Sequence, residues 1–347
     1  MKIKIGKKII KEKTPCFIIA EAGVNHNGKF ELAKKLIDVA KEAGVDAVKF
    51  QTFKSEEIVT PDASQAKYQA ENIGKRESQH AMLKRLELPY SAFRELKEYC
   101  DKKKIIFLST PHSEDAIDFL EPLVPAFKIG SGDLTNLPFL EKIAKKKKLI
   151  ILATGMATLK EIGEAVKTIK KAGNNKIILL HCTTNYPCPL EEVNLKAMIT
   201  LKKKFGLPVG YSDHTLGIRV PIMARALGAQ VIEKHFTLNK NLPGPDHKAS
   251  LEPNELKNMV KAIRETEKAL GSPIKKPTKA EQKIKKLVRK SIVAKVAIPK
   301  NSKIIRDMLV TKRPGTGIES RYMKRVLGKR VKTNVKKEDL ITWRIIL

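Results

Sequence analysis

The sequence has few of the features that mark membrane, secreted or redox proteins. It contains no apolar run near the roughly 20 residues that a bilayer-spanning helix needs. Residues 1–13, MKIKIGKKIIKEK, carry charge throughout and lack the apolar core of a signal peptide. The four cysteines (Cys16, Cys100, Cys182 and Cys188) form no C-x-x-C pair. We therefore expect a cytoplasmic protein with reduced thiols and no membrane partner.

Acidic and aromatic residues are also scarce. Asp and Glu number 37 against 69 Lys and Arg, which gives a formal net charge of +32, and aromatic residues make up 5% of the chain. Surfaces that bind nucleic acids usually gather basic residues on one element, with aromatic side chains among them. Here the lysines recur on most of the expected helices, which is typical of solvated helix faces. The composition thus predicts no specific nucleic-acid partner, and its positive field favours an anionic substrate.

What the sequence does contain is a regular alternation of short β-rich runs and helical stretches. The runs occupy residues 17–23, 46–52, 104–110, 125–131, 149–155, 176–182, 207–214 and 230–236. Nearly every run is followed by a helical pattern, and several patterns end on the Gly expected beyond a helix C-terminus. Eight such units predict an α/β fold of the (β/α)8, or TIM, barrel type. A doubly wound open sheet is the alternative, but no G-x-G-x-x-G motif follows the first run.

Two parts of the chain fall outside that alternation. Residues 53–88 are longer than a normal βα loop, which predicts a partly helical lid or substrate loop. After Gly271 the chain is rich in Pro and Lys, and then it shows short apolar runs broken by Pro, Asn and Gly. We therefore expect a catalytic barrel over residues 1–271, a linker over 272–284 and a small, mostly β domain over 285–347.

The expected strands begin apolar and end polar. In VIEKHF, residues 231–236, the strand period of two places Glu233 and His235 on one face. The active site of a barrel lies at the carboxyl ends of its strands, so a ring of polar ends predicts a catalytic site. The ring consists of Glu21, Lys49, Gln51, Ser109, Thr110, Lys128, Ser131, Thr154, Ser212, Asp213, His214, Glu233 and His235.

Two pairs of residues in this ring indicate its chemistry. His214 and His235, with Glu233 nearby, suit a divalent metal and leave room for water and substrate. The alternative is one general-base histidine and one structural histidine. Lys49 and Lys128 would either form a Schiff base or anchor a phosphate or carboxylate. The hydroxyls around the lysines favour the anion site.

Ten motifs, in chain order, give the sequence a specific resemblance. It resembles the sialic acid synthases, which condense phosphoenolpyruvate with N-acetylmannosamine or a related hexosamine. The motifs are EAGVNHNG, AVKFQTF, STP, KIGSGDLTNLP, TGM, HCTTNYP, GYSDHTLG, IEKHFTL, GPDHKASLEP and TKRPGTG, which span nearly the whole chain. The C-terminal segment resembles the antifreeze-like (SAF) domain of that family, which implies a domain-swapped homodimer.

The resemblance also implies roles for individual residues. It makes His214 and His235 ligands of a divalent metal, with Mn²⁺ preferred over Mg²⁺ or Co²⁺, and it makes Glu233 their supporting carboxylate. The residues implied to bind phosphoenolpyruvate are Lys49, Thr110, Lys128, Ser131, Thr154, Thr184 and Ser212. Those implied to surround the sugar are Glu21, Gln51, Tyr186, Asp246 and Arg313. The catalytic set is Glu21, Asp133, His214 and His235.

Three positions depart from the familiar form of these motifs. Ala153 stands where a phosphate-binding Ser is usual, Thr184 where some members carry Asn, and Asp133 where some carry Glu. The first departure leaves open whether Thr154 or a backbone N–H compensates.

The predicted reaction is the attack of the enolpyruvyl C3 on an aldehyde, followed by addition of water and loss of phosphate. The function expected from the sequence is N-acetylneuraminate synthase acting on N-acetylmannosamine. The alternative is a legionaminate or pseudaminate synthase that uses a 2,4-diacetamido-trideoxyhexose. A Schiff-base aldolase and a non-catalytic carbohydrate-binding protein are the rivals from other classes.

Overall fold

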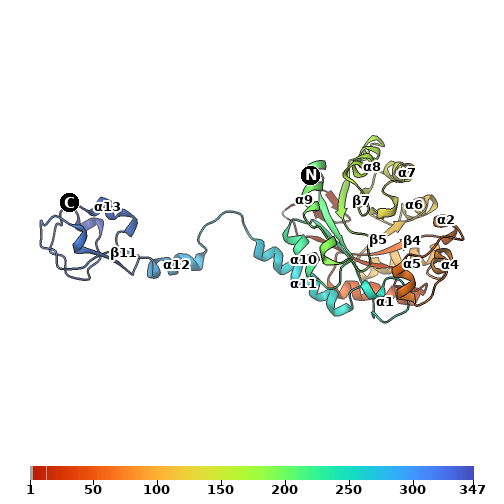
Figure 1. The fold of residues 1–347 in the computed structure, drawn as a ribbon, viewed down its shortest axis with the longest axis horizontal. Coiled ribbons are helices and arrows are strands. Elements are labelled where there is room, and N and C mark those ends of the chain that lie inside the picture. The colour runs from red at the N-terminus through yellow and green to blue at the C-terminus, as the bar shows by residue number, and fades with distance from the viewer. Residues whose placement is uncertain (1–2, 13) are drawn as a thin grey trace. The chain divides into compact units, whose positions relative to one another are not determined.

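The computed structural model describes residues 3–12 and 14–347, which form two compact units, Met1–Gly271 and Ser272–Leu347. The first unit contains the expected barrel, with helices outside a ring of strands (Figure 1). Its strands are β3 (Phe17–Gly23), β4 (Ala47–Thr52), β5 (Ile106–Pro111), β6 (Ala126–Ile129), β7 (Leu149–Ala153), β8 (Ile177–His181), β9 (Val209–Asp213) and β10 (Val231–His235).

All eight strands belong to one parallel sheet with the order β5-β4-β3-β10-β9-β8-β7-β6. The sheet curls so far that β5 and β6, at its two ends, lie in contact, which nearly closes the barrel. The predicted (β/α)8 architecture is therefore confirmed, and with it the prediction that all strand ends of one polarity meet.

The strands are aliphatic because both of their faces are buried. In β7, Leu149 and Ile151 point into the barrel, while Ile150 and Leu152 point outward and pack against the helices. This alternation repeats around the ring and separates an inner core from the larger core between strands and helices. The inner core fills the lower part of the barrel and leaves a cavity at the carboxyl ends of the strands.

A hairpin that the sequence reading missed closes the opposite end of the barrel. Strands β1 (Ile3–Ile5) and β2 (Lys8–Ile10) pair antiparallel across a turn at Gly6, whose φ is +55°. Their buried isoleucines join the core inside the barrel. The Ile-Lys-Ile sequence of residues 3–5 is therefore a strand pattern with one face buried and one face in water.

The barrel helices follow the strands, as the pattern predicted. They are α1 (Phe30–Ala43), α5 (Tyr90–Lys103), α6 (Glu114–Leu120), α7 (Leu137–Lys145), α8 (Leu159–Lys171), α9 (Ala197–Phe205), α10 (Arg219–Ala226) and α11 (Pro253–Leu270). Helix α1 ends at Gly44, which adopts the left-handed conformation that favours glycine. Helix α8 begins with a capping box, in which Thr158 and Glu161 each accept a backbone N–H of the other residue. Within residues 3–12 and 14–347, no helix combines the length and apolarity needed to cross a bilayer.

The long segment after β4 is partly helical, as predicted. It contains α2 (Ser55–Ile58), α3 (Lys67–Ile73) and α4 (Gln79–Lys84), and it has a small apolar core of its own around Phe53 and Met82. The carbonyl of Arg85 lies so close to Gly28 that any Cβ at that position would clash with it. Gly28 thus lets the segment pack directly onto the loop that follows β3.

The second unit is small and built from short extended pieces. Strands β11 (Ser291–Ala294) and β12 (Leu309–Lys312) pair antiparallel, and isolated bridges such as Val293 to Leu340 join other parts of the chain. Its core is aliphatic. The unit also contains α12 (Lys279–Val288), which begins inside the expected linker, and α13 (Met323–Val326). The 3-10 turns of the two units are η1 (Ser131–Asp133), η2 (Leu190–Glu192), η3 (His247–Ala249), η4 (Arg306–Met308), η5 (Ser320–Tyr322) and η6 (Trp343–Ile345).

Candidate active site

A polar cavity of about 190 Å³ lies at the carboxyl ends of the strands, where the sequence predicted a site. Every strand of the barrel, or the residues directly after it, contributes to its wall. The sequence-predicted residues that line it are Glu21, Lys49, Gln51, Thr110, Lys128, Ser131, Thr184, Tyr186, Ser212, His214, Glu233 and His235.

Two lysines and two glutamates form the floor of this cavity. Lys49 Nζ lies 2.7 Å from Glu21 Oε2 and donates to Thr110 Oγ1 at 3.0 Å. Glu233 lies between the lysines, with its oxygens 3.6 Å from Lys49 Nζ and 3.5 Å from Lys128 Nζ. All four charged side chains are at most 5% exposed. The pairing keeps these buried charges compensated, and an incoming anion would compete with the glutamates for the lysines.

The pKa values of the two glutamates move in opposite directions. Burial raises the pKa of Glu21 to about 7, against the opposing effect of Lys49. Glu233 is equally buried, but Lys128 and Lys49 together with the Ser212 hydroxyl overcome the effect of burial and lower its pKa to about 2. Glu21 is therefore the carboxylate of this pair that can gain or lose a proton near neutral pH.

The two lysines also differ. The carboxylates of Glu21 and Glu233 raise the pKa of Lys49 despite its burial, so this amine stays protonated. Burial lowers the pKa of Lys128, whose nearest carboxylate is farther away. Lys128 is therefore the one of the two lysines in which a Schiff base would have to form.

A cluster of small groups lies on the β7 and β8 side of the cavity. Ser131 Oγ accepts the backbone N–H of Gly155 at 3.0 Å and lies 3.2 Å from Cys182 Sγ. A Cβ on Gly155 would clash with the hydroxyl of Thr184, so glycine is required for this close approach. Ala153 lines the cavity beside this cluster.

Thr154 does not line the cavity. Its hydroxyl donates to the carbonyl of Leu180 at 3.0 Å, within the wall between β7 and β8. The sequence left open whether Thr154 replaces the serine that is usual at position 153. Its side chain points away from the cavity, which leaves a backbone N–H as the other alternative, and the hydroxyls of Ser131 and Thr184 line this wall.

The two predicted metal-ligating histidines lie next to each other on the β9 and β10 side. Their ring centroids are 5.6 Å apart, and the Tyr186 ring packs 4.0 Å from the ring of His214. His214 Nδ1 donates to the Thr183 carbonyl at 2.6 Å, which leaves Nε2 with a lone pair. Burial lowers the pKa of His214 to about 4 and holds the pKa of His235 well below its usual value, so both rings are neutral at pH 7.

These donors fit a divalent cation. The buried Nδ1 of His235 has no hydrogen-bond partner among the described residues, and Asp246 Oδ2 lies 4.0 Å from it. Neutral imidazoles with a free lone pair are the usual nitrogen ligands of such ions. No group of three or more His, Cys, Asp and Glu side chains in residues 3–12 and 14–347 forms a complete cation site. The other ligands would therefore have to be water or substrate.

The carboxylates around the histidines differ in what they contact. Glu233, expected to support them, contacts Ser212 and the two lysines directly and interacts with His235 only through its charge. The carboxylate nearest to His235 Nδ1 is Asp246 instead. Asp246 is itself buried, and burial raises its pKa to about 6.

The segment after β4 reaches this side of the site. The ring of Tyr68 in α3 stacks on Tyr186 at 5.3 Å, and the side-chain amide of Asn72 donates to the Pro245 carbonyl at 2.6 Å. Helix α3 therefore borders the part of the site near Asp246, where the sugar was expected.

The sequence reading missed His112, which lines the cavity opposite the paired histidines. Its Nδ1 lies 3.7 Å from Asp133 Oδ2, and its buried Nε2 has no hydrogen-bond partner within the described residues. Asp133, predicted as catalytic, does not line the cavity. It lies behind His112, which does. The sequence could have indicated His112 as a site residue, because it directly follows the STP motif at the end of β5.

A buried ion pair behind the wall joins strands β9 and β10. Lys234 and Asp213 point away from the cavity, and Lys234 Nζ lies 2.6 Å from Asp213 Oδ2 with both side chains 0% exposed. Lys234 also donates to the carbonyl of Thr215. The polar residues of VIEKHF therefore lie on both faces of β10. Glu233 and His235 face the cavity, and Lys234 faces the helices.

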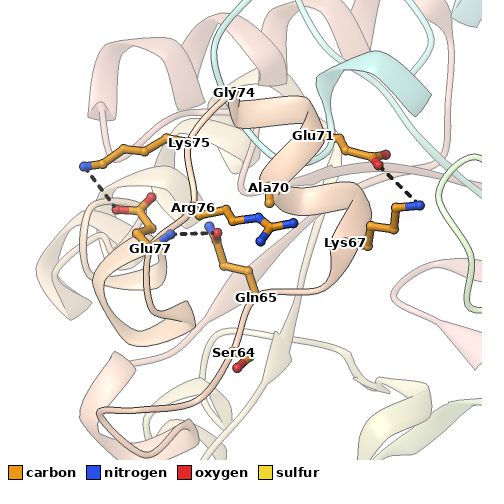
Figure 2. Close-up of a pocket in the computed structure, with 9 residues that line it drawn as sticks. All are labelled: Ser64, Gln65, Lys67, Ala70, Glu71, Gly74, Lys75, Arg76 and Glu77. Carbon is orange, nitrogen blue, oxygen red and sulfur yellow. Dashed lines mark hydrogen bonds and ion pairs between the residues drawn. The ribbon is translucent and has the colours of Figure 1, made fainter.

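Arg313 belongs to the second unit, and a second pocket lies in the segment after β4. Arg313 is exposed in the second unit, directly after β12. This second pocket, about 730 Å³, is lined only by residues between 64 and 77. Figure 2 shows that its acids are already paired, Lys67 with Glu71 and Lys75 with Glu77. No strand-end residue borders this pocket, so it is a feature of the segment after β4 and not of the candidate active site.

Comparison with known proteins agrees with this geometry. Residues 36–275 match the NeuB family and residues 289–344 match the SAF domain. The chain is 53% identical over 327 residues, 93% of its length and 98% of the relative's, to the N,N'-diacetyllegionaminic acid synthase of Campylobacter jejuni. It is 39% identical to the human N-acetylneuraminate-9-phosphate synthase, over 96% of this chain and 93% of that one.

A solved structure gives the same result. The N-acetylneuraminic acid (sialic acid) synthetase of Leptospira borgpetersenii, crystallised with citrate, matches with a TM-score of 0.73 at 37% identity, and the match covers 82% of this chain and 95% of that one. The resemblance read from the motifs is confirmed: the chain belongs to the NeuB family and is an enzyme of the sialic acid synthase type, with a barrel followed by a SAF domain.

Proposed function

We propose that this enzyme is an N,N'-diacetyllegionaminic acid synthase, which condenses phosphoenolpyruvate with an open-chain 2,4-diacetamido-trideoxyhexose and releases phosphate. The observation that carries the proposal is the 53% identity, over nearly the whole chain, to the Campylobacter jejuni synthase of that name. The synthase of the same name from Legionella pneumophila is 48% identical. The sequence alone favoured N-acetylmannosamine as acceptor, and the 37% identity to the N-acetylneuraminic acid synthetase of Leptospira borgpetersenii keeps that sugar as the second candidate.

The floor of the cavity suits phosphoenolpyruvate. Lys49 and Lys128 supply positive charge, and Thr110, Ser131 and Ser212 supply hydroxyls. Glu233, held between the lysines, fixes the two amines a short distance apart before the substrate arrives. Such preorganisation lowers the cost of binding a multiply charged anion, because the lysines need not be ordered at that moment.

His214 and His235 would hold a divalent cation, with Mn²⁺ as the first choice and Mg²⁺ or Co²⁺ as alternatives. When bound, this ion supplies Lewis-acid polarisation of the acceptor's aldehyde oxygen. The Thr183 carbonyl fixes the tautomer of His214 and directs its Nε2 lone pair away from the backbone. Asp246 supplies the carboxylate nearest to His235, at 4.0 Å from Nδ1.

The bond-forming step requires the enolpyruvyl C3 to face the aldehyde carbon. The lysines hold the phosphate and the histidine side holds the sugar, so both substrates occupy one small cavity in fixed orientation. Attack leaves positive charge at C2, which the carboxylate of Glu21 can stabilise. Gln51 Nε2, which donates to Glu21 Oε1 at 3.3 Å, holds that carboxylate in place.

Turnover with two acceptors tests the proposal. Phosphate release from phosphoenolpyruvate should have a higher kcat/KM with the 2,4-diacetamido-6-deoxy acceptor than with N-acetylmannosamine. The reverse order would support the N-acetylneuraminate alternative.

Lys128→Met should abolish release with either sugar. Borohydride treatment in the presence of pyruvate should trap no adduct, and an adduct on Lys128 would favour the Schiff-base aldolase. Absence of phosphate release across a hexosamine panel would favour a non-catalytic carbohydrate-binding protein.

We also propose that the enzyme works as a homodimer in which Arg313 contacts the sugar bound to the partner. The family resemblance motivates this role, and two features of the second unit support it. Arg313 is exposed and has no ion pair or hydrogen bond among the described residues. Helix α12 exposes Ile284, Leu287 and Val288, an apolar stripe that isolated chains seldom leave in water.

A further inference from the structure

One cavity group has no role in the reaction as described so far. His112 follows β5, and its backbone N–H donates to the Thr52 carbonyl at 3.2 Å, which fixes the residue against the neighbouring strand. The edge of its ring packs on Phe53, with ring centroids 6.2 Å apart and planes at 79°. Packing and backbone together leave the ring little freedom, and its Nε2 is buried without a partner among the described residues.

The other ring nitrogen faces a carboxylate. Asp133 Oδ2 lies 3.7 Å from His112 Nδ1, slightly beyond hydrogen-bond length. A carboxylate in this place favours the tautomer with the proton on Nδ1, which leaves the lone pair on Nε2. An imidazole oriented by a carboxylate, with the lone pair of the far nitrogen directed at the substrate, is the arrangement of a general base. Catalytic hydrogen bonds are often long before the substrate binds.

The charges around His112 suit that task. Three charged groups face the ring: Lys49 from β4, Lys128 from β6 and Asp133 from η1. Burial, followed by the two lysines, lowers the pKa of His112 to about 4, so the ring is neutral and has a free lone pair at pH 7. A phosphate bound to the lysines would compensate their charge and raise the pKa of His112. Substrate binding would thus make the ring a stronger base.

We propose that His112 Nε2 removes a proton from the water that adds to C2, an assignment that rests on the proposed function. The water oxygen bonds to C2 while one of its protons passes to Nε2. The imidazolium then gives that proton to the bridging oxygen as the C2–O bond to phosphate breaks. The second water proton leaves the C2 hydroxyl as the carbonyl forms, and it neutralises the alkoxide made from the aldehyde. His112 ends neutral, as it began, and Asp133 is its positioning residue.

Steady-state kinetics of His112→Gln test this role against a matched control. We expect kcat to fall about 10²-fold to 10⁴-fold, the usual contribution of a general base, with little change in the KM for phosphoenolpyruvate. Asp133→Asn should lower kcat in the same direction, because it removes the charge that fixes the tautomer. His26→Gln is the control: His26 is also buried, its Nε2 also has no partner and its pKa is also about 4, but it lies outside the cavity.

Three kinetic results would overturn the proposal. The first is a kcat within a few-fold of wild type for His112→Gln in folded protein. The second is a raised KM for phosphoenolpyruvate at unchanged kcat, which would make His112 an anion ligand. The third is an equal loss in His26→Gln, which would make both effects structural.

A spectroscopic measurement separates this inference from the proposed function, because it needs no turnover. In ¹⁵N-histidine spectra of the wild-type enzyme with phosphoenolpyruvate, His112 should carry its proton on Nδ1. The His112→Gln spectrum assigns the signal. His26 serves as internal reference for the opposite tautomer, since its Nδ1 accepts the Gly28 N–H at 3.1 Å. A proton on Nε2 of His112 would leave no lone pair in the cavity and would overturn the proposal. A lack of turnover by wild type would count against the proposed function alone.

Discussion

Lys234→Met should destabilise the barrel because it leaves Asp213 buried without its counter-charge. Both side chains are 0% exposed, so no water can replace the lost ammonium. Methionine nearly matches the volume of the lysine stem, so the substitution removes the charge and leaves little cavity. Asp213 keeps two acceptor contacts, from the Thr215 backbone N–H at 3.2 Å and from its hydroxyl at 3.0 Å.

The magnitude follows from the distance and the burial. At 2.6 Å, an effective dielectric constant of about 20 gives roughly 6 kcal/mol of attraction between the charges. Desolvation of both ions offsets much of this, and removal of one partner of a buried pair costs about 3–5 kcal/mol. Because Thr215 still stabilises Asp213, we expect a loss of about 3 kcal/mol in the free energy of unfolding.

Urea unfolding can measure this loss in the barrel alone. Trp343 is the one tryptophan of the sequence and lies in the second unit, so its fluorescence follows that unit. Circular dichroism at the helix band is dominated by the barrel, which contains most of the helices. The dichroism transition should move to lower urea in Lys234→Met. The tryptophan transition should stay where it is.

Two further variants make the test decisive. Adding Asp213→Asn removes the unpaired charge and keeps an acceptor for Thr215, so the double variant should recover most of the loss. Lys240→Met removes an ion pair of the same length, 2.6 Å to Glu255, but this pair is about one-third exposed and should contribute under about 1 kcal/mol. A loss below about 1 kcal/mol in Lys234→Met, or a double variant no more stable than the single one, would refute the reasoning.

Three further predictions concern the site. EDTA should abolish turnover, with activity restored by Mn²⁺, Mg²⁺ or Co²⁺, and His235→Ala should lower kcat with little change in the urea midpoint; full activity of chelated enzyme would contradict the metal proposal. Ala153→Ser should leave the KM for phosphoenolpyruvate unchanged or tighten binding by up to about 1 kcal/mol, the contribution of one hydrogen bond; a large loss would mean that the pocket requires alanine. Arg313→Ala mixed with His235→Ala should regain roughly a quarter of wild-type activity after subunit exchange, since half the dimers then carry one complete site; an inactive mixture would exclude action on the partner.

The order of strands and helices was predictable because it depends on local signals. Runs of β-branched and aliphatic residues alternate with amphipathic stretches, and parallel strands joined by helices have one favoured arrangement. The same regularity predicted that polar residues at strand ends would meet. The cavity is lined by residues from every strand or its following loop, as this argument requires. The motifs identified the family.

The tertiary structure decided where the side chains of the site point and which of them touch. Glu233 was predicted to support the histidines, and the fold also places two lysines within 3.6 Å of it. Thr154 follows the strand end as expected, yet it lies in the wall because a carbonyl of β8 is available there. Asp246 lies beside His235 although 11 positions separate them in the chain.

The sequence by itself determined which residue types gather at one end of a barrel. The period of each strand and the alternation of strands with helices can be read from residues that are neighbours in the chain. Only the fold decided which of them face each other, because side chains on different strands meet through sheet register and barrel closure. His112 shows the difference. Its position after β5 is visible in the sequence, but its free Nε2, its contact with Asp133 and its place near two lysines arise from four separate elements. Long-range electrostatics and packing, which no local pattern records, therefore set the chemistry of this site.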